Sequence, residues 1–409
     1  MHTIIIGGGM AGLAAATTLM HNGHTFQLIE QDIKLGGRVQ TSHVDGHLID
    51  HGFQVYLPGY EEGKHFFDYN TLQLKHFAPG AMVLYDQGYY DAIGDPLRRP
   101  FTVFNTLLSK VGSFADKQRL LKLKNKSIEY INEPFSVDTS MSTYDFLVKF
   151  GFKQEMIHNF FIPFFSGVFF EQKLETSSAM FLYLYHKFAT SLASIPALGM
   201  GQLSEQLAAA LPDSNIHLGE PVISINQKSV QVASGKIYIG DNIILTANSE
   251  KLTPKMAAVP DTKFNASHTI YFEADEAPYR RKLIGIVARK NAIVNNIAIM
   301  SNVSKAYAPS GKHQIAVSIF GTEFNKDIET RIKKECSAWF GNQTSQWRVI
   351  QQQLIKKALP KQMKVRFKFS REECQIGERL FCAGDFMLNS SINGALKSGR
   401  LAAEYAMQS

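Results

Sequence analysis

The sequence is poor in cysteine and has no apolar segment long enough to cross a membrane. Its 409 residues include three cysteines, Cys336, Cys374 and Cys382, and no C-x-x-C pair. That pattern predicts neither a disulfide framework nor a metal site, and it suits a reducing cytoplasm. No uncharged apolar segment reaches the ~18 residues of a transmembrane helix, and residues 160–170 come nearest. Because a strand pattern already begins at residue 2, we expect no signal peptide and a cytoplasmic protein.

Charge is also sparse. Charged residues make up 19% of the chain and hydrophobic residues 45%, which describes a globular protein whose length suggests two or three structural units. The net charge of +7 is spread along the chain, and the densest basic stretch, residues 117–126, has helical spacing without interleaved aromatic residues. We therefore expect a solvated helix face there and no nucleic-acid partner, with peripheral contact to an acidic membrane surface as an alternative.

The first thirty residues carry the most specific pattern. Residues 2–6 have the composition of a buried strand, residues 10–21 of a helix and residues 25–29 of a second apolar strand. The turn between the first strand and the helix is rich in glycine. It consists of Gly7, Gly8, Gly9, Met10, Ala11 and Gly12. This is the G-x-G-x-x-G pattern in the strand-turn-helix context of a dinucleotide-binding Rossmann unit.

Each part of this turn has its own physical role in holding a dinucleotide. Gly7 allows the tight turn, Gly9 lets the backbone approach a pyrophosphate, and Gly12 lets the helix pack closely on the strand. The N–H groups at the helix N-terminus, around Met10 and Ala11, offer a partial positive charge to the phosphates. At the end of the second strand, the carboxylate of Glu30 is placed to accept hydrogen bonds from a ribose 2′-OH. A 2′-phosphate would be repelled there, which disfavours NADP.

A second glycine pair follows the acidic residue. These two glycines lie six residues past Glu30 and allow another close approach of the backbone to the cofactor. The arginine that follows them carries a fork of donors that suits a phosphate. The contacts predicted in this segment are Gln31, Gly36, Gly37, Arg38 and Val39.

With these residues in view, the sequence resembles the FAD-containing family of phytoene desaturases, protoporphyrinogen oxidases and flavin amine oxidases. Their signature is a dinucleotide motif, a ribose Glu and then Gly-Gly-Arg. The segment His51-Gly52-Phe53 resembles the one that leads toward the flavin ring in that family. The resemblance also implies that a backbone pair near Val222 holds the adenine and that Ala247 borders the flavin crevice.

The last forty residues resemble the C-terminal FAD motif of the same family. A buried strand ends in Gly384-Asp385, and after a loop a helix opens with Asn393, Gly394 and Ala395. Asp385 would accept a hydrogen bond from a ribityl hydroxyl. The N–H groups of residues 393–395 would face the pyrophosphate or the flavin O2 edge.

The resemblance covers the whole chain in segment order and implies an α/β architecture of two discontinuous domains. Residues 1–55, 200–250 and 370–409 would form a Rossmann-like, glutathione-reductase-like FAD domain. Residues 56–199 and 251–369 would form an α+β substrate domain. Flavin amine oxidases typically attach FAD to a cysteine near the C-terminus, whereas Cys382 lies inside the strand before Gly-Asp and not in the loop near the ring. We therefore expect non-covalent FAD.

The composition of the two long middle segments predicts helices followed by a second sheet. A hairpin is predicted at residues 82–93. Further predicted helices span residues 116–131, 143–150, 153–170 with a kink at Pro163, 176–192, 202–211 and 325–340. Further predicted strands span residues 216–218, 222–225, 230–232, 237–245, 268–273, 283–288, 296–302 and 314–320.

Aromatic residues are concentrated in the helices between residues 140 and 195. They are Phe160, Phe161, Phe164, Phe165, Phe169, Phe170, Phe181, Tyr183 and Tyr185. Short apolar runs are usually buried, so a core helix is the simpler interpretation of residues 160–170. At helical spacing, however, these side chains cover too wide an arc to face one core. We expect some of them to line a long pocket or a membrane-facing mouth for a hydrophobic substrate.

No side-chain pattern identifies a catalytic residue. Residues 252–369 contain no H-x-x-x-H, no G-x-S-x-G and no defensible carboxylate pair. A flavin can carry the chemistry itself, with the protein supplying binding and orientation. We therefore expect an FAD-dependent oxidoreductase that removes hydride from a C–H bond of a largely apolar small molecule, as a desaturase does. The alternatives are a flavin amine oxidase, a non-redox FAD-dependent polyene isomerase, and a flavin-binding protein that acts through a membrane or partner contact.

Overall fold

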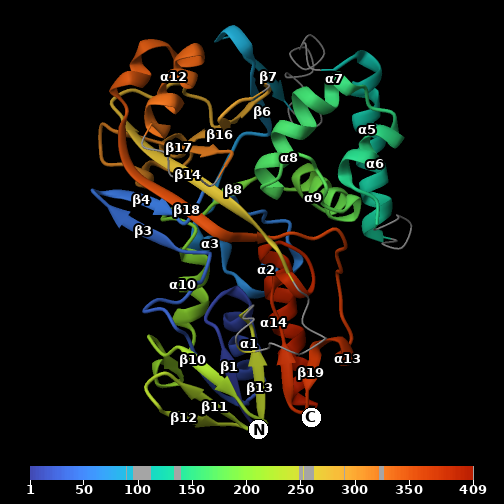
Figure 1. The fold of residues 1–409 in the computed structure, drawn as a ribbon, viewed down its shortest axis with the longest axis vertical. Helices are drawn as coiled ribbons and strands as arrows, with labels where there is room; N and C mark the ends of the chain where they lie inside the picture. Colours follow the sequence, from blue (N-terminus) through green and yellow to red (C-terminus); the bar gives the residue numbers. More distant parts are fainter. Residues whose placement is uncertain are drawn as a thin grey trace.

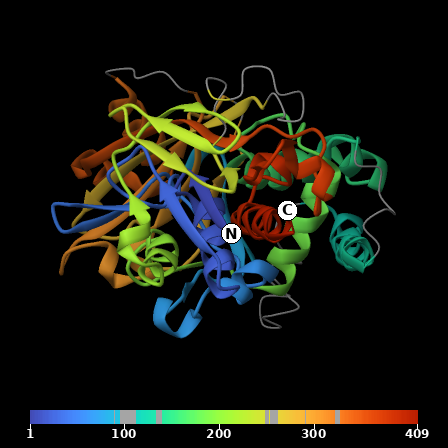
Figure 2. The ribbon, with the colours of Figure 1, turned by 90° about the horizontal axis from the view of Figure 1, so that it is seen from below.

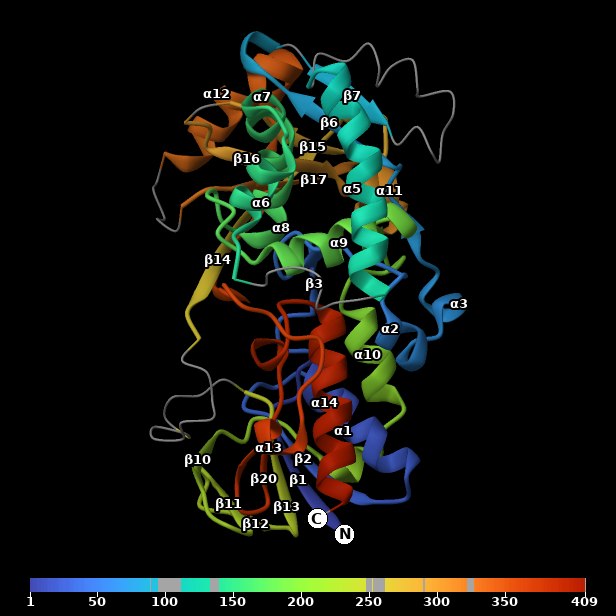
Figure 3. The same ribbon diagram turned by 90° about the vertical axis from the view of Figure 1, so that its right-hand side faces the viewer.

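Two lobes stack along the long axis of the structure (Figure 1). The computed structural model describes residues 1–88, 90–94, 112–132, 140–247, 252, 262–289, 291–321 and 327–408. Both termini lie at the free end of the lower lobe, where helices α1 (Met10–His21) and α14 (Ile392–Met407) run side by side (Figure 3).

The lower lobe is built on a six-stranded sheet in the order β19-β20-β13-β1-β2-β9. Neighbouring strands are parallel except for β19, which is antiparallel to β20. The strands are β1 His2–Ile6, β2 Thr25–Ile29, β9 Ile216–His217, β13 Asn242–Leu245, β19 Gln375–Gly377 and β20 Leu380–Cys382. Three segments that are far apart in the sequence therefore share one sheet.

Alternating side chains place this sheet between two apolar layers. Ile5 of β1 packs in the cluster that contains α1 and α14, whereas Ile4 and Ile6 pack with residues of a small antiparallel sheet. That sheet consists of β10 Val222–Ile225, β11 Ser229–Val232 and β12 Ile237–Ile239. Figure 2 shows the small sheet and α14 on different sides of β1. The helix α10 (Gln202–Ala209) also contacts α1.

The upper lobe is built on a seven-stranded sheet in the order β18-β14-β17-β16-β15-β6-β7. All neighbouring strands are antiparallel except β15 and β6. The strands are β6 Gly80–Leu84, β7 Tyr90–Gly94, β14 Phe264–Ala274, β15 Ile284–Val287, β16 Val294–Ile299, β17 His313–Ile319 and β18 Arg348–Pro360.

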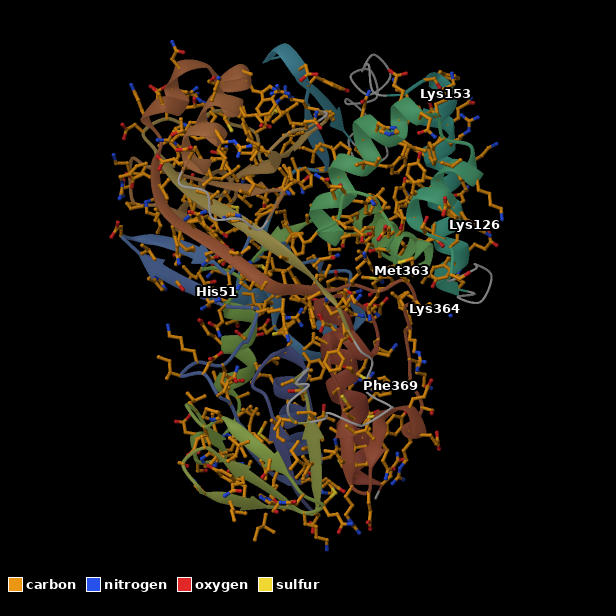
Figure 4. All side chains as sticks on the ribbon, in the orientation of Figure 1. His51, Lys126, Lys153, Met363, Lys364 and Phe369 are labelled. Carbon is orange, nitrogen blue, oxygen red and sulfur yellow. The ribbon has the colours of Figure 1, made fainter. Side chains whose placement is uncertain are left out.

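Helices lie on both faces of the upper sheet. Helix α12 (Ile328–Phe340) buries Ile332 and Cys336 against one face, beside Ile270 and Phe272 of β14. Helix α8 (Ile162–Phe169) contacts β15 and β16 from the other face. The helical layer around α8 comprises α5 Phe114–Asn132, α6 Thr143–Phe150, α7 Gln154–Met156 and α9 Ser178–Thr190. Figure 4 shows Lys126 of α5 on the outer side of this layer, and it pairs with Glu129 at 2.8 Å.

Shorter elements lie between these main elements in the chain. They are β3 Thr41–Val44, β4 His47–Asp50, α2 Glu61–Phe66, α3 Tyr69–Leu72, β5 Lys75–His76, β8 Ser194–Ile195, α11 Met300–Val303 and α13 Arg371–Cys374. In the part of the chain that the structure describes, no helix is both long and apolar enough to span a bilayer.

The predicted bounds of β1, α1, β2 and α6 are confirmed. The predicted helix over residues 153–170 is instead α7, a π-helical segment Ile157–Phe161 and α8. Pro163 lies near the N-terminus of α8, where its missing N–H is tolerated, and the wider π turns precede it. The predicted strand over residues 237–245 is two strands, β12 and β13, and β18 was not predicted. The first two residues of the predicted helix 325–340 lie outside the described residues.

The contact between α14 and α1 leads to a stability prediction. A Cβ atom on Gly399 would lie 2.0 Å from the carbonyl oxygen of Ala11. Gly399→Ala must therefore push the helices apart, and we expect it to lower the free energy of unfolding by about 1–3 kcal/mol in urea denaturation. Gly377→Ala is the control, because its Cβ would meet only ordinary contacts at 3.4 Å or more. Equal stability of the two variants would contradict this description of the helix contact.

Candidate functional site

A cavity of about 890 Å³ extends along the junction of the two lobes, where Figure 4 places His51. Its lining includes most of the cofactor contacts predicted from the sequence. These are Gly7, Gly9, Met10, Ala11, Glu30, Gln31, Gly36, Gly37, Arg38, Val39, His51, Gly52, Phe53, Val222, Ala247, Gly384, Asp385 and Ala395. Segments at both ends of the chain therefore meet around one space.

The glycine-rich turn after β1 has the backbone geometry that its sequence predicts. Gly7 has φ +104°, which disfavours any residue with a Cβ atom, and its N–H donates to the carbonyl of Ile29. A Cβ on Gly12 would lie 1.9 Å from the carbonyl oxygen of Gly7, so the helix can approach the turn only because this residue is glycine. A Cβ on Gly9, at the start of α1, would meet nothing within 4 Å. The helix N-terminus therefore opens onto free space that a phosphate can occupy.

The second glycine pair lies directly against the first turn. The N–H of Gly36 donates to the carbonyl of Gly8 at 2.8 Å, and Gly9 and Gly36 form an isolated parallel bridge. Gly37 has φ +57°, and a Cβ there would lie 3.3 Å from the Cα of Gly9. The two glycine segments thus form one continuous backbone wall of the cavity.

The carboxylate of Glu30 organises the same wall. Oε2 accepts the N–H of Gly8 at 2.5 Å, and Oε1 accepts the N–H of Asp32 at 2.9 Å. The side chain is 7% exposed and lines the cavity. Each carboxylate oxygen has a second lone pair, so Glu30 can hold the turn and still accept a ribose hydroxyl.

Arg38 and Asp385 bind each other. An Nη atom of Arg38 lies 2.7 Å from Oδ1 of Asp385, and the other Nη donates to the carbonyl of Ala358 on β18 at 2.8 Å. The sequence assigned Arg38 to a phosphate and Asp385 to a ribityl hydroxyl. The structure joins the two charges into one ion pair that links the lower lobe to β18. Because both side chains also line the cavity, their contacts with the cofactor stay a prediction.

The loop of residues 51–53 is held from above by the upper sheet. The N–H of Gly52 donates to Oε1 of Gln353 at 2.7 Å, and the N–H of Phe53 donates to Oγ1 of Thr269 at 3.3 Å. His51 lines the cavity, and burial together with the charge of Lys34 lowers its pKa. His51 is therefore neutral at pH 7, with a ring nitrogen within hydrogen-bonding distance of Ser42 at 3.1 Å.

Three predicted contacts do not line the cavity. Gly12 packs on the turn behind it. Oδ1 of Asn393 accepts the N–H of Glu62 at 3.0 Å, and the N–H of Gly394 donates to the capping hydroxyl of Ser391 at 2.9 Å. The N–H of Ala395, which does line the cavity, donates to the carbonyl of Ser391 within α14. The N–H groups of residues 394 and 395 are therefore used in helix capping and in the helix itself, and the predicted contact of residues 393–395 with the cofactor stays a prediction.

The upper half of the cavity is largely apolar. Of the nine aromatic residues noted between residues 160 and 185, Phe164 and Phe170 line it, together with Val168, Leu184 and Phe188. Most of the others are core residues, namely Phe161, Phe165, Phe169, Phe181 and Tyr183. Five of the nine aromatic residues are therefore core residues, and two line the cavity, as the pocket interpretation predicted for some of them.

The sequence did not identify the residues that the upper sheet contributes. Ser267 of β14, Ile284 and Ile286 of β15, Asn296 of β16 and Ile355 of β18 all line the cavity. The period-two alternation along the predicted strands contained this information, but the face that would meet the cavity was not assigned. Among the described residues, no group of His, Cys, Asp or Glu is arranged to hold a metal ion.

Asp50 is the last residue of β4, directly before the loop of residues 51–53, and its side chain is buried. Its carboxylate accepts hydrogen bonds from Thr41 Oγ1 at 2.6 Å, from Tyr307 Oη at 2.7 Å and from the N–H of Met200 at 2.8 Å. Burial raises the pKa of Asp50 to about 6, although the three hydrogen bonds act in the opposite direction. Asp50 does not line the cavity, so it positions β4 and the adjoining His51 from behind.

These features define an α/β protein with a cavity that joins a glycine-rich turn of the dinucleotide-binding type to a largely apolar chamber, the upper half of the cavity. Comparison with known families identifies it further. The family described as flavin containing amine oxidoreductase matches residues 10–407. The protein belongs to this family and is an FAD-dependent oxidoreductase.

Two curated relatives match short segments. A coproporphyrinogen III oxidase from Propionibacterium freudenreichii subsp. freudenreichii is 40% identical over 60 residues, which are 14% of this chain and 11% of that protein. A 4,4'-diaponeurosporene oxygenase from Staphylococcus aureus strain Mu50 is 33% identical over 76 residues, which are 19% of this chain and 15% of that protein. The matched segments therefore span only a small part of either relative.

A solved structure matches over the full length. Putrescine oxidase bound to putrescine has a TM-score of 0.74 at 15% identity, and the match covers 100% of both chains. At this identity the match establishes the fold, which is that of an α/β protein with mixed sheets.

Glu30 leads to a binding prediction. Glu30→Ala removes the acceptor of two backbone N–H groups and of the predicted ribose hydroxyl, and hydrogen bonds to a charged acceptor contribute about 1.5–3 kcal/mol. We expect FAD affinity to fall at least tenfold when the apoprotein is titrated with FAD and the quenching of flavin fluorescence is followed. Glu30→Gln keeps one amide oxygen and should lose less. Unchanged affinity of Glu30→Ala would mean that this carboxylate only supports the turn.

Asp50 leads to a pH prediction. Its pKa is raised from 3.8 to about 6 on folding, so between these values the folded state binds more protons than the unfolded state. The stabilising contribution is therefore complete below about pH 4 and is lost as the pH rises through 6, a change of roughly 3 kcal/mol. Asp50→Asn should flatten the urea-denaturation stability profile in this window. A variant whose profile keeps the wild-type slope would show that another group causes it.

Proposed function

We propose that the lower lobe binds FAD along the wall formed by the two glycine segments. The observation that supports this is the open space at the start of α1, which a carboxylate, a helix N-terminus and the glycine backbone surround. In this proposal a Rossmann-like, glutathione-reductase-like domain consists of residues 1–55, 200–250 and 370–409. Residues 56–199 and 251–369 form the substrate domain above it.

The residues of the cavity fit the parts of FAD in order. Gly9 and Gly37 would face the pyrophosphate, Glu30 the adenosine ribose, and Val222 the adenine. The loop of residues 51–53 would border the flavin ring, which supplies hydride acceptance when bound. The protein itself contributes orientation, because Gln353 and Thr269 fix the backbone of this loop.

The three proteins compared above are named for three chemically different classes of substrate. An apolar polyene needs an apolar chamber, a carboxylated tetrapyrrole needs several cations, and a diamine needs anionic or aromatic cages for its ammonium groups. Among the described residues that α8, α9 and β14–β18 contribute to the cavity there is no carboxylate, and the single charged side chain is Lys357. This lining favours a largely apolar substrate, from whose C–H bond the enzyme removes hydride.

Anaerobic reduction of the bound flavin tests the substrate class. The purified FAD-loaded enzyme is mixed separately with 4,4'-diaponeurosporene, coproporphyrinogen III and putrescine, and the visible absorbance band of the oxidised flavin is followed. We expect the polyene to bleach this band and putrescine to leave it unchanged. Bleaching by putrescine but not by the polyene would overturn the assignment.

The cysteines lead to a prediction about flavin attachment. Cys336, Cys374 and Cys382 are fully buried, and none of them lines the cavity. Burial raises the pKa of all three thiols, that of Cys374 to about 12, so the reactive thiolate is disfavoured. Acid precipitation should therefore release all the flavin into the supernatant as FAD. Yellow colour retained in the washed pellet would indicate a covalent link.

A further inference from the structure

One row of side chains crosses the upper sheet along the wall of the cavity. Strand register places Gln353, Thr269, Ser318, Asn296 and Ile286 next to one another on β18, β14, β17, β16 and β15. Directly paired residues on neighbouring strands project from the same face of a sheet. Asn296 and Ile286 line the cavity, and the first two members hold the loop of residues 51–53. The row therefore runs from the proposed flavin position into the apolar chamber.

Asn296 differs in its hydrogen bonding from Gln353 and Thr269, the polar residues at the β18 end of the row. The acceptor oxygens of Gln353 and Thr269 are used by the loop. Asn296 is 5% exposed, and its buried Oδ1 has no hydrogen-bond partner in the part of the chain that the structure describes. No hydrogen bond to its Nδ2 is found among the described residues either. A buried amide without partners is unfavourable in the free protein, so its presence in a binding cavity indicates that a ligand supplies the partner.

The neighbouring Asn295 provides an internal comparison. It is also 5% exposed, but with its amide oriented to suit its neighbours it donates to the carbonyl of Pro163 at 3.3 Å and accepts the N–H of Gly167 at 3.1 Å. The pairing of β16 with β17 shifts register between Val294 and Asn296, as at a β-bulge, and this irregularity lets two successive side chains turn toward α8. The amide of Asn295 therefore forms hydrogen bonds with α8, whereas the amide of Asn296 is available to a ligand in the cavity.

We propose that Asn296 is a specificity-determining residue that binds a hydroxyl group on an otherwise apolar substrate. A hydroxyl both donates to Oδ1 and accepts from Nδ2, so it satisfies both ends of the amide at once. The surroundings of Asn296 in the cavity are apolar, with Ile286 and Phe164 among them, and an ionised group would be poorly solvated there. This inference rests on the proposed function, because it specifies the substrate of the same cavity.

The register also locates the hydroxyl relative to the reacting bond. Asn296 lies two strands away from Thr269, which holds the loop proposed to border the flavin, and two strand spacings are about 10 Å. The hydroxyl is therefore several carbon atoms away from the C–H bond that is oxidised. Ser267 also lines the cavity, but its Oγ lies beside Gly52, at the flavin end of the row. Asn296 is the group that meets the remote end of the substrate.

The test compares an alcohol with its methyl ether, which keeps the acceptor oxygen and loses the donor. Binding of 1-octanol and of 1-methoxyoctane to the FAD-loaded enzyme is measured by isothermal titration calorimetry. We expect wild type to bind the alcohol roughly tenfold or more tightly than the ether. Asn296→Leu should remove this preference. Ser318→Ala, which changes the neighbouring member of the row outside the cavity lining, should keep it.

Thermal unfolding without added probe gives a second readout. Asn296→Leu replaces an amide without partners by an apolar side chain, so its melting temperature should equal or exceed that of wild type. Asn295→Leu breaks two hydrogen bonds and should melt lower. If Asn296→Leu does not accumulate as folded protein, Asn296→Ala is measured in its place and should also lose the preference for the alcohol.

The outcomes separate this inference from the proposed function. Equal binding of alcohol and ether by wild type would overturn the role of Asn296 and leave the apolar cavity supported. A preference that persists in Asn296→Leu would assign recognition of the hydroxyl to another group. Failure of the FAD-loaded wild type to bind either probe would overturn both the apolar-substrate assignment and the inference built on it.

Discussion

Two backbone contacts determine how the cofactor end of the cavity is built. A Cβ on Gly12 would lie 1.9 Å from the carbonyl oxygen of Gly7, and a Cβ on Gly399 would lie 2.0 Å from that of Ala11. Helix α1 is thus held between the turn after β1 and helix α14 at separations that only glycine allows. The same packing brings the loop before α14, with Asp385, to the cavity. The glycines of the motif therefore serve helix packing as much as they serve the space that a phosphate requires.

The parts of the fold that could be predicted are those whose determinants are local. The unit β1-α1-β2 combines apolar strands, a glycine turn and a helix stop within thirty residues, and its bounds follow from them. Strand β18 has no such signature, because three successive glutamines, residues 351–353, interrupt any apolar alternation. Its thirteen residues form a strand because β14, some eighty positions earlier, pairs with it along most of its length, with two register shifts. Strand formation there depends on tertiary context rather than on composition.

The residues of the candidate site also fall into two groups, those that a local motif predicts and those whose partners depend on the tertiary fold. The glycine wall and Glu30 were predicted because each residue acts within its own motif. Arg38 and Asp385 were each assigned to the cofactor, yet they are 347 positions apart and pair with each other. Local sequence carries no information about which charges meet in space. The N–H of Gly394 is a different case, because Ser391 three residues earlier is a recognisable N-cap that already accounts for it.

The apolar chamber depends on how the aromatic helix is rotated. Phe161, Phe165 and Phe169 are spaced by four residues and face the core, whereas Phe164 and Val168 are spaced by four on the cavity side. The π-helical turns at residues 157–161 advance by more residues per turn than an α-helix and so set the rotation of α8 that follows. Gly167 then lets α8 approach β16 closely, since a Cβ there would lie 2.6 Å from Nδ2 of Asn296. Because the flavin supplies the redox chemistry in this family, the selectivity of the protein must come from such placements: an apolar wall oriented by the π-helical turns, with a buried amide set into it.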